Sequence, residues 1–442
     1  MAKRQLKLGA FMRPVSIHTG AWRYPGAWPD ANFNFPLIKK LIQKLEAGKF
    51  DAFFMADHLA VLNMPVDALK RSHTVTSFEP FTLLSALAGA TEHIGLIATG
   101  STTFDEPYHV ARRFASLDHI SGGRAAWNVV TTAYAKSGAV FGRPHPSHAE
   151  RYSMAEEFVQ ACRLLWDTWD ADAFIGDKVT GTFVRPGSLH QPDFHGKYFT
   201  VTGGLNVPRA PQGHPVLIQA GSSGPGQALA ARIADVIFTA QNDMAEAKTF
   251  YDGLKAQVTD FGRDPAGALV MPGVFPVVGR TEAEAREIFA ELNRRIDTQQ
   301  AFTVLSDRLG TDMSDYPLDA PVPDLPETEH LKSRAALLIE MARRDRLTLR
   351  ELYHRVAAAR GHLLLLGSPV QVADVLEQWF RAGAADGFNV MPPFFPGQFD
   401  AFADGVVPIL QERGLFRADY AGATLRDHLG LEAAGRPKND EN

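Results

Sequence analysis

The segment HPVLIQAGSSGPGQALAARIADVIFTAQ, residues 214–241, carries the pattern that decides the fold. It begins with an apolar run, HPVLIQAG, that has the length of a buried strand, and it continues with the glycine-rich turn GSSGPG. The next residues, GQALAARIA, predict a helix, and the apolar run DVIFTAQ predicts a second strand. Strand, turn, helix and strand in this order predict one unit of a parallel α/β sheet.

The same alternation runs through most of the chain and adds up to about eight strand–helix units. Besides the two strands above, apolar runs predict strands at 6–11, 51–57, 93–100, 124–132, 268–279 and 387–394. Eight units are the count of a (β/α)8 TIM barrel, whose right-handed crossovers place the helices outside the strands. A doubly wound sheet remains an alternative, because alternation alone does not separate the two architectures.

Two segments interrupt this rhythm, so we expect one barrel domain over residues 1–442 with two insertions. Residues 170–213 are rich in Gly, Pro, His and Asp and predict an irregular insertion. Residues 281–366 are mostly helical around a proline-rich middle and are long enough for a helical cap over one barrel face. The polar tail, residues 432–442, is expected to be frayed.

Composition excludes several classes of protein. The 442 residues are 45% hydrophobic, which is ample for a large buried core. The net charge of −5, with both signs dispersed, leaves no basic field for nucleic acid or lipid. The single cysteine, Cys162, excludes a disulfide framework and a cysteine-based zinc site and fits the reducing cytosol. No apolar run has the length of a signal peptide or a membrane span, so we expect a cytoplasmic protein. We also expect no bound metal.

Polar residues at predicted strand ends are the first site candidates, since barrel active sites collect where the strands end. Asp57 ends one strand, Thr103 follows the next, and Asn128 lies inside a strand that is otherwise apolar. Each has a structural alternative: a helix cap for Asp57, a common strand-end residue for Thr103, and a buried structural hydrogen bond for Asn128.

The string HPSHAERYSMAEE, residues 145–157, predicts a helix start at Ser147, because Ser147 and Glu150 have capping-box spacing. His148 and Tyr152 then lie one turn apart near the positive end of this helix, where an anion is favoured. An exposed histidine and tyrosine without a role remain the alternative.

The turn GSSGPG, residues 221–226, has the arrangement of a phosphate-binding turn between a strand and a helix. Its glycines allow close approach of the backbone, and Ser222 and Ser223 offer hydroxyl donors. The glycine spacing is not that of a dinucleotide fingerprint, and the Walker lysine is absent. A plain corner without a ligand remains the alternative.

Six strings taken together resemble the luciferase-like flavin monooxygenases, in the branch of nitrilotriacetate, dibenzothiophene sulfone and long-chain alkane monooxygenases. They are GAWRYPGA, GKFDAFFMADHLA, STTFDEPYHVARRFASLDHISGGRAAWNVVT, SHAERYSMAEEF, HGKYFTVTGGLNVPRAPQGHPVLIQAGSSGPG and FNVMPP. The similarity extends over about residues 6–393.

This resemblance implies a TIM barrel that binds FMN non-covalently at its open end. The cofactor contacts it implies are Asp57, Thr103, Asn128, His148, Tyr152, Ser222, Ser223 and Gly224. Three residues are candidates for catalysis: His148 for proton transfer, Asn128 as an amide near the isoalloxazine ring, and His18 as a second histidine. A plain loop histidine is an equal interpretation of His18.

The resemblance also implies two-component chemistry, in which a separate NAD(P)H:flavin reductase supplies reduced FMN, mainly by diffusion, and O2 is the co-substrate. The expected substrate is a small organic molecule, namely an organosulfur compound, an aminopolycarboxylate or a hydrophobic xenobiotic, often cleaved at a C–S or C–N bond. Relatives form homodimers or homotetramers. Some relatives carry a cysteine in the loop after the first strand, whereas residues 12–20, MRPVSIHTG, have none.

Two kinds of residue are candidates for the substrate pocket: aromatic residues and arginines. The aromatic candidates are Phe11, Trp22, Tyr24, Phe78 and Phe394. They favour an apolar guest, whereas Arg13 and Arg23 would suit a carboxylate. Two other functions remain open: a deazaflavin-dependent oxidoreductase on the same barrel, and a flavin-binding protein without turnover.

Overall fold

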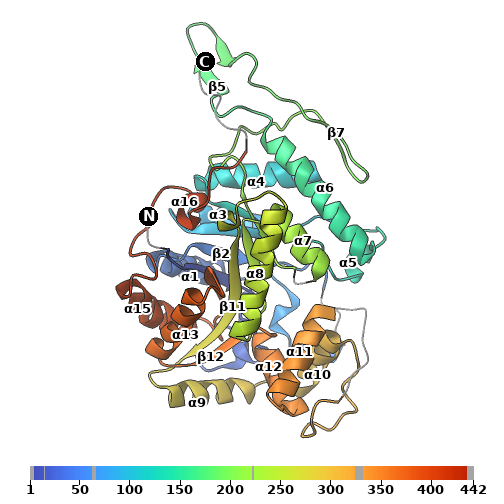
Figure 1. Cartoon of the computed structure of the whole chain (residues 1–442), viewed down its shortest axis with the longest axis vertical. Coiled ribbons are helices and arrows are strands. Elements are labelled where there is room, and N and C mark those ends of the chain that lie inside the picture. Colours follow the sequence, from blue (N-terminus) through green and yellow to red (C-terminus); the bar gives the residue numbers. More distant parts are fainter. Residues whose placement is uncertain (1–3, 14, 62–65, 222, 324–331, 436–442) are drawn as a thin grey trace.

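The computed structural model describes residues 4–13, 15–61, 66–221, 223–323 and 332–435. Its centre is a closed barrel of eight parallel strands surrounded by helices (Figure 1). The strands are β1 (Lys7–Met12), β2 (Ala52–Met55), β3 (Gly95–Ser101), β4 (Ala125–Val130), β9 (Val216–Gln219), β10 (Val236–Thr239), β11 (Leu269–Val278) and β13 (Gly387–Val390). Pairing between β10 and β11 joins the two ends of the sheet. The barrel prediction is therefore confirmed, and an open doubly wound sheet is excluded.

The strands are apolar on both faces because each face is covered. In β4, the outward side chain of Trp127 packs in the cluster shared with the helices, and the inward Ala126 packs in the barrel interior. Phe53 and Phe54 of β2 divide in the same way. The alternation of side chains along a strand thus produces two hydrophobic layers, one inside the barrel and one between barrel and helices.

The helices that cover the outside follow the strands along the chain. The longer ones are α1 (Phe35–Ala47), α3 (Pro80–Ala88), α4 (Pro107–Ser121), α6 (His148–Trp166), α7 (Gly224–Ile233), α8 (Met244–Asp260) and α13 (Pro369–Arg381). The shorter ones are η1 (Ala21–Arg23), α2 (Val66–Leu69), η2 (His73–Val75), α5 (Lys136–Val140), η3 (Pro265–Gly267), α14 (Gly397–Ala401), η4 (Phe402–Val406), α15 (Val407–Glu412) and α16 (Leu425–Leu429).

The two predicted insertions have regular structure. The segment 170–213 contains two antiparallel hairpins, β5 (Phe174–Asp177) with β6 (Thr182–Val184) and β7 (Asp193–His195) with β8 (Thr200–Thr202). These hairpins project from the barrel beyond α6 (Figure 1).

The second insertion is helical, as the sequence predicts, and contains α9 (Glu282–Asn293), α10 (Thr298–Leu309), α11 (Lys332–Arg344) and α12 (Leu349–Ala359). Helices α10, α11 and α12 have a hydrophobic core of their own, in which Leu305, Leu338 and Val356 are buried. They lie together beside the barrel (Figure 1).

The end of this second segment differs from the sequence prediction. Leu363–Gly367 is not helical but forms strand β12, which pairs in parallel with the second half of β11. The chain leaves α12 through Arg360 in the left-handed conformation (φ 52°), so the helix ends before the four leucines begin. Leucine favours helices, which is why a short run of leucines did not indicate a strand.

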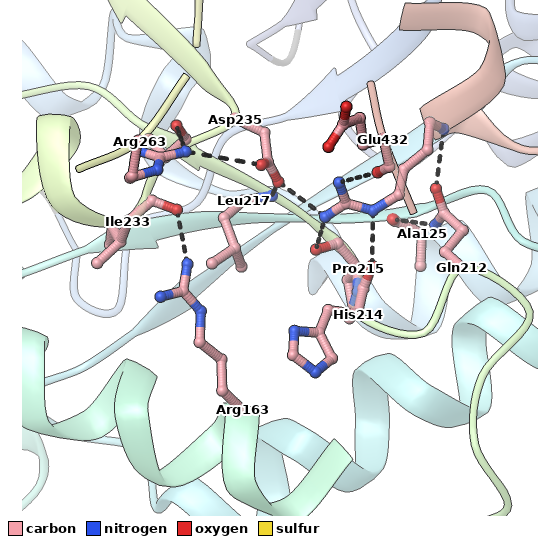
Figure 2. Close-up of polar contacts among 12 residues, drawn as sticks. Ala125, Arg163, Gln212, His214, Pro215, Leu217, Ile233, Asp235, Arg263 and Glu432 are labelled. Carbon is pink, nitrogen blue, oxygen red and sulfur yellow. Dashed lines mark hydrogen bonds and ion pairs between the residues drawn. The ribbon is translucent and has the colours of Figure 1, made fainter. Parts of the chain in front are cut away.

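Helix α16 (Leu425–Leu429) closes the end of the barrel opposite the strands' carboxyl ends. The buried Arg426 in this helix lies 3.0 Å from the carboxylate of Asp235 and donates from Nε to the carbonyl oxygen of His214 at 3.2 Å. Asp235 in turn accepts a hydrogen bond from the backbone N–H of Leu217 (Figure 2). This network ties α16, the last helix among the described residues, to the amino ends of β9 and β10.

The polar tail is described as far as residue 435. The carbonyl oxygens of Glu432 and Ala434 accept hydrogen bonds from Arg426 and Arg209, so this part of the tail is attached to the barrel. Cys162 is buried in α6, and burial raises the pKa of its thiol well above the usual value, which makes it a core residue. None of the described helices is long and apolar enough to span a membrane.

Candidate active site

The carboxyl ends of the barrel strands open into two adjoining cavities. The smaller one, about 480 Å³, is lined by Asp57, Thr99 and Ser101, and we call it the Asp57 cavity. The larger one, about 1230 Å³, contains four arginines in its wall, and we call it the arginine cavity. Six residues line both: Thr131, Ala133, Ala135, Tyr152, Ala220 and Gly221. The two cavities therefore form one continuous site at the expected end of the barrel.

Two helices direct their amino ends at the arginine cavity. Helix α6 begins at His148, and the hydroxyl of its N-cap, Ser147, accepts a hydrogen bond from the Glu150 N–H at 3.3 Å. Helix α7 begins at Gly224, and the hydroxyl of Ser223 accepts from the Gly226 N–H at the same distance. Both predicted helix starts are thus present, and their positive ends favour an anion in the cavity.

The turn before α7 depends on glycine at particular positions. A Cβ atom on Gly221 would lie 2.8 Å from the Cα of Gly226, so the two glycines are in close backbone contact. A Cβ on Gly224 would meet nothing within 4 Å. The turn is therefore tight on its inner side and open on the side where Ser223 and Gly224 line the cavity. Ser222, the other predicted hydroxyl donor, lies outside the described residues.

His148 and Tyr152 stand together at this wall. Their ring centroids are 4.9 Å apart, and Tyr152 lines both cavities, whereas the exposed His148 lies at the rim of the arginine cavity. Partial burial and the nearby charge of Arg151 lower the pKa of His148. The imidazole is therefore neutral at pH 7 and can accept a proton or a hydrogen bond.

Asp57 lies half-buried at the end of β2, in the wall of the smaller cavity. Its Oδ1 accepts a hydrogen bond from the backbone N–H of His58 at 2.7 Å. Burial raises the pKa of the Asp57 carboxyl above its ordinary value, and the charges of Glu79 and Asp105 add to this effect. The carboxyl is therefore positioned to exchange a hydrogen bond with a polar ligand group in this cavity.

Asn128 is buried in β4 and lies one contact away from the Asp57 cavity. Its Nδ2 donates to the hydroxyl of Thr99 at 3.0 Å, and Thr99 lines the cavity. Its Oδ1 is buried without a hydrogen-bond partner among the described residues. The sequence predicts a hydrogen-bond partner for this strand asparagine, and Thr99 is the partner of the amide nitrogen. The amide oxygen can still accept a hydrogen bond.

Thr103 is close to the site but does not line either cavity within the described part of the chain. Its hydroxyl donates to the carbonyl oxygen of Thr131 at 2.9 Å, and Thr131 lines both cavities. The next residue, Thr132, has φ 46°, an uncommon value for a β-branched residue, and its hydroxyl is 2.7 Å from that of Ser101. Thr103 thus helps to hold a strained strand end against the site.

His18 is fully buried and contacts neither cavity. Its Nδ1 accepts the N–H of Gly20 at 3.0 Å, so Nε2 carries the proton and donates to Asn293 Oδ1 at 3.2 Å. Burial lowers the pKa of His18 to about 3. With both ring nitrogens engaged, the geometry assigns His18 to linking the loop after β1 to α9 rather than to a reacting group.

The substrate-pocket candidates divide among several places. Phe11 and Arg13 line the arginine cavity, whereas Trp22 and Arg23 line a separate pocket of about 210 Å³. Tyr24 stacks on Phe394 at 4.1 Å, and Phe78 packs against Phe33, so these three predicted residues serve packing.

The structure adds residues that sequence reasoning did not single out. They are His145, Arg151, Arg308, Arg360 and His362, all in the wall of the arginine cavity. Arg151 follows the predicted helix start at Ser147 by four residues and could have been found from that position. Arg308 and Arg360 lie in the helical insertion, and no local pattern indicates that this insertion faces the barrel's open end.

The chain is similar to known proteins over nearly its whole length. The profile of the luciferase-like monooxygenase family matches residues 14–386. N-acetyl-S-(2-succino)cysteine monooxygenase of Bacillus subtilis (strain 168) is 49% identical over 434 residues, which are 97% of each chain. Nitrilotriacetate monooxygenase component A of Aminobacter aminovorans is 44% identical over 448 residues, 99% of this chain and 98% of its own. Riboflavin lyase, solved with modified FMN and the substrate riboflavin, superposes with a TM-score of 0.88 at 31% identity, covering 97% of this chain and 96% of its own.

Proposed function

Because this chain belongs to the luciferase-like monooxygenase family and is a flavin-dependent monooxygenase, we propose that it uses reduced FMN from a separate reductase. In this proposal it transfers one oxygen atom from O2 to a small organic substrate. The observation that carries the proposal is the meeting of two helix amino ends, those of α6 and α7, at one cavity.

The residues of this wall fit the phosphate of FMN. The N-caps Ser147 and Ser223, together with Gly224, line the cavity, and none of the described residues in its lining is Asp or Glu. A phosphate would therefore meet the positive ends of two helices without facing a carboxylate. We assign the phosphate to Ser223, Gly224, His148 and Tyr152, with Ser222 retained from the sequence.

The Asp57 cavity fits the polar ring of the flavin. Asp57 and Thr99 offer hydrogen-bonding groups in its wall, and Asn128 reaches the same place through Thr99. When bound, reduced FMN supplies the two electrons that activate O2 for transfer of an oxygen atom to the substrate. We assign Thr103 as a positioning residue, because its hydroxyl holds Thr131 at the junction of the two cavities.

The chain's own residues orient the reactants, exclude water and manage protons. The apolar side chains of Phe11, Phe238 and Met391 exclude water from the deeper part of the arginine cavity. An imidazole nitrogen of His148 can accept a proton at pH 7, because burial and Arg151 lower its pKa. Positioned groups of this kind act without rearrangement when charge develops in the substrate.

Delivery of the reduced cofactor by a separate protein also belongs to the proposal. The sequence has neither a dinucleotide fingerprint nor a Walker lysine, and the relative from Aminobacter aminovorans is component A of nitrilotriacetate monooxygenase. We assign the supply of reduced FMN to an NAD(P)H:flavin reductase that contacts this chain transiently. A homodimeric or homotetrameric assembly remains a proposal carried over from the resemblance.

Aerobic turnover tests the proposal. The purified chain is incubated with NADH, FMN, a flavin reductase and, in separate reactions, N-acetyl-S-(2-succino)cysteine, nitrilotriacetate or dibenzothiophene sulfone, followed by mass spectrometry under ¹⁸O2. We expect a product that contains one labelled oxygen, or a fragment from C–S or C–N cleavage, only when reductase and O2 are both present. Turnover with a reduced deazaflavin and without O2 would instead indicate an oxidoreductase, and flavin binding without any product a non-catalytic protein.

A further inference from the structure

We propose that Arg13, Arg308 and Arg360 form a carboxylate-binding subsite in the arginine cavity, and that the substrate is a small molecule with two or more carboxylates. We call these three residues the arginine cluster. The inference rests on the proposed function and specifies its substrate class.

The cluster is assembled from segments far apart in the sequence. Arg13 follows β1, Arg308 lies at the end of α10, and Arg360 is the C-cap of α12. All three line the cavity whose other wall holds the amino ends of α6 and α7. The helices that carry two of the arginines lie together beside the barrel in Figure 1. The helical insertion thus contributes charge to the barrel's open end.

The charge of the arginine cavity is one-sided. Its lining contains the arginine cluster, Arg151 and the histidines His145, His148 and His362, but no Asp or Glu among the described residues. The whole chain, in contrast, has a net charge of −5. Cationic groups concentrated in the wall of a concave site focus a positive potential there and favour an anionic guest.

The guanidinium of Arg13 is destabilised by burial and by the neighbouring positive charge of Arg308. Its Nε is buried without a hydrogen-bond partner among the described residues. Burial and the charge of Arg308 lower the pKa of Arg13 to about 10. A guanidinium held in this way is stabilised by an anion that binds in front of it, because the anion restores the missing hydrogen bond and offsets the charge.

The charges of all three arginines affect the same side chain, His58. Burial lowers the pKa of His58 to about 2, and the charges of Arg13, Arg360 and Arg308 all contribute. His58 lies in the wall of the Asp57 cavity, to which we assign the flavin ring. Because the arginine cavity shares six lining residues with the Asp57 cavity, a substrate held by the arginine cluster can lie beside the flavin ring.

Arg360 occupies a backbone position that glycine usually takes. It caps α12 with φ 52° and is 8% exposed. The left-handed conformation is strained for a residue with a Cβ atom, so stability alone would favour glycine here. A buried, charged side chain at such a position indicates a function for the guanidinium.

The apolar neighbours of the cluster define the rest of the guest. Phe11, Ile17, Phe238 and Met391 line the same cavity. Planar guanidinium groups bind carboxylates in a two-pronged geometry, and the apolar walls suit a short carbon chain between them. This combination favours a thioether or amine that carries several carboxylates over a neutral sulfone or an alkane.

Calorimetric titration with 2,2′-thiodiacetate, a thioether with two carboxylates, tests the subsite, and its uncharged diamide is the matched ligand. We expect the FMN-loaded wild type to bind the dicarboxylate at least tenfold more tightly than the diamide. Arg13→Gln, Arg308→Gln and Arg360→Gln should each weaken dicarboxylate binding at least tenfold and change FMN affinity less than twofold. Arg23→Gln, an arginine outside the cavity, is the control and should leave both affinities unchanged.

Three results would overturn the subsite: equal binding of diamide and dicarboxylate, unchanged dicarboxylate binding in the Gln variants, or loss of FMN binding in those variants. The last result would assign the cluster to the flavin phosphate. If Arg308→Gln does not fold, Arg308→Lys and the Arg13 variant carry the test. If the wild type binds the dicarboxylate through these arginines but binds no flavin, the subsite stands and the proposed function fails.

Discussion

The rings of His148 and Tyr152 lie 4.9 Å apart, one turn from each other, at the amino end of α6. This places an imidazole, a phenol and a positive helix end in the wall of the same cavity. Helix α7 points its own amino end at that cavity through Ser223. The two helix ends and the phenol of Tyr152 are therefore expected to determine the affinity for FMN.

Replacement of Tyr152 by Phe is expected to weaken FMN binding about tenfold or more, because a hydrogen bond to a charged group contributes about 1.5–3 kcal/mol. Quenching of flavin fluorescence on titration measures the dissociation constant. Ser153→Ala is the matched control, since Ser153 is an exposed residue of the same helix and should not change the affinity. Wild-type affinity in Tyr152→Phe would remove this residue from the phosphate site.

Asn128→Ala separates a structural role from a functional one. The lost hydrogen bond to Thr99 should lower the free energy of unfolding by about 1 kcal/mol. If the free amide oxygen serves the flavin, kcat should fall at least tenfold in the folded variant. Asn389→Ala, at another buried asparagine of the barrel, is the control and should cost stability without a comparable loss of kcat. Equal effects on kcat in the two variants would count against a functional role.

His18 predicts a specific pH dependence of stability. Burial lowers its pKa from 6.5 to about 3, with smaller contributions from His73, His354 and Arg360, so between these values the unfolded chain binds a proton that the folded chain does not. The stabilisation is therefore complete above pH 6.5 and decreases as the pH falls, by up to about 1.4 kcal/mol per pH unit.

Urea unfolding of the wild type and His18→Gln at pH 7, 6 and 5 measures this dependence. The slope of the unfolding free energy against pH should be shallower in the variant by the share of this one histidine. Other buried histidines keep part of the slope in both proteins. Identical slopes would show that His18 does not titrate in the way its burial implies.

Arg426→Ala is expected to destabilise the closed end of the barrel by about 3 kcal/mol, because it removes a buried guanidinium and leaves the half-buried Asp235 carboxylate without this partner. Thermal unfolding measures the loss. Arg381→Ala, which removes an exposed i,i+4 ion pair with Glu377, should change stability by less than about 0.5 kcal/mol. The FMN affinity of the folded Arg426 variant should equal that of the wild type, since α16 lies at the other end of the barrel.

The eight strands of the closed barrel could be predicted from the sequence because each is a short apolar run followed by a turn and a helical pattern. Strand β12 could not, because its leucines fit a helix equally well and its pairing with β11 is a tertiary contact. The two hairpins in residues 170–213 were also missed, because their strands are short and largely exposed.

Within the site, local signals led to residues that the structure brings together: Asp57, His148, Tyr152, Ser223 and Gly224 all line the two cavities. Thr103 and Asn128 reach the cavities only through Thr131 and Thr99, which a linear pattern does not show. The arginine cluster depends on how the helical insertion packs against the barrel, so no spacing in the sequence predicts it.

The central claim, that FMN binds with its phosphate between the amino ends of α6 and α7, is tested most directly by the FMN affinity of Ser223→Asp. Aspartate caps a helix as well as serine does, so α7 should remain intact while a carboxylate faces the phosphate. We expect the variant to lose FMN binding at least a hundredfold and to keep most of its affinity for riboflavin, which has no phosphate. Unchanged FMN affinity in the folded variant would contradict the claim.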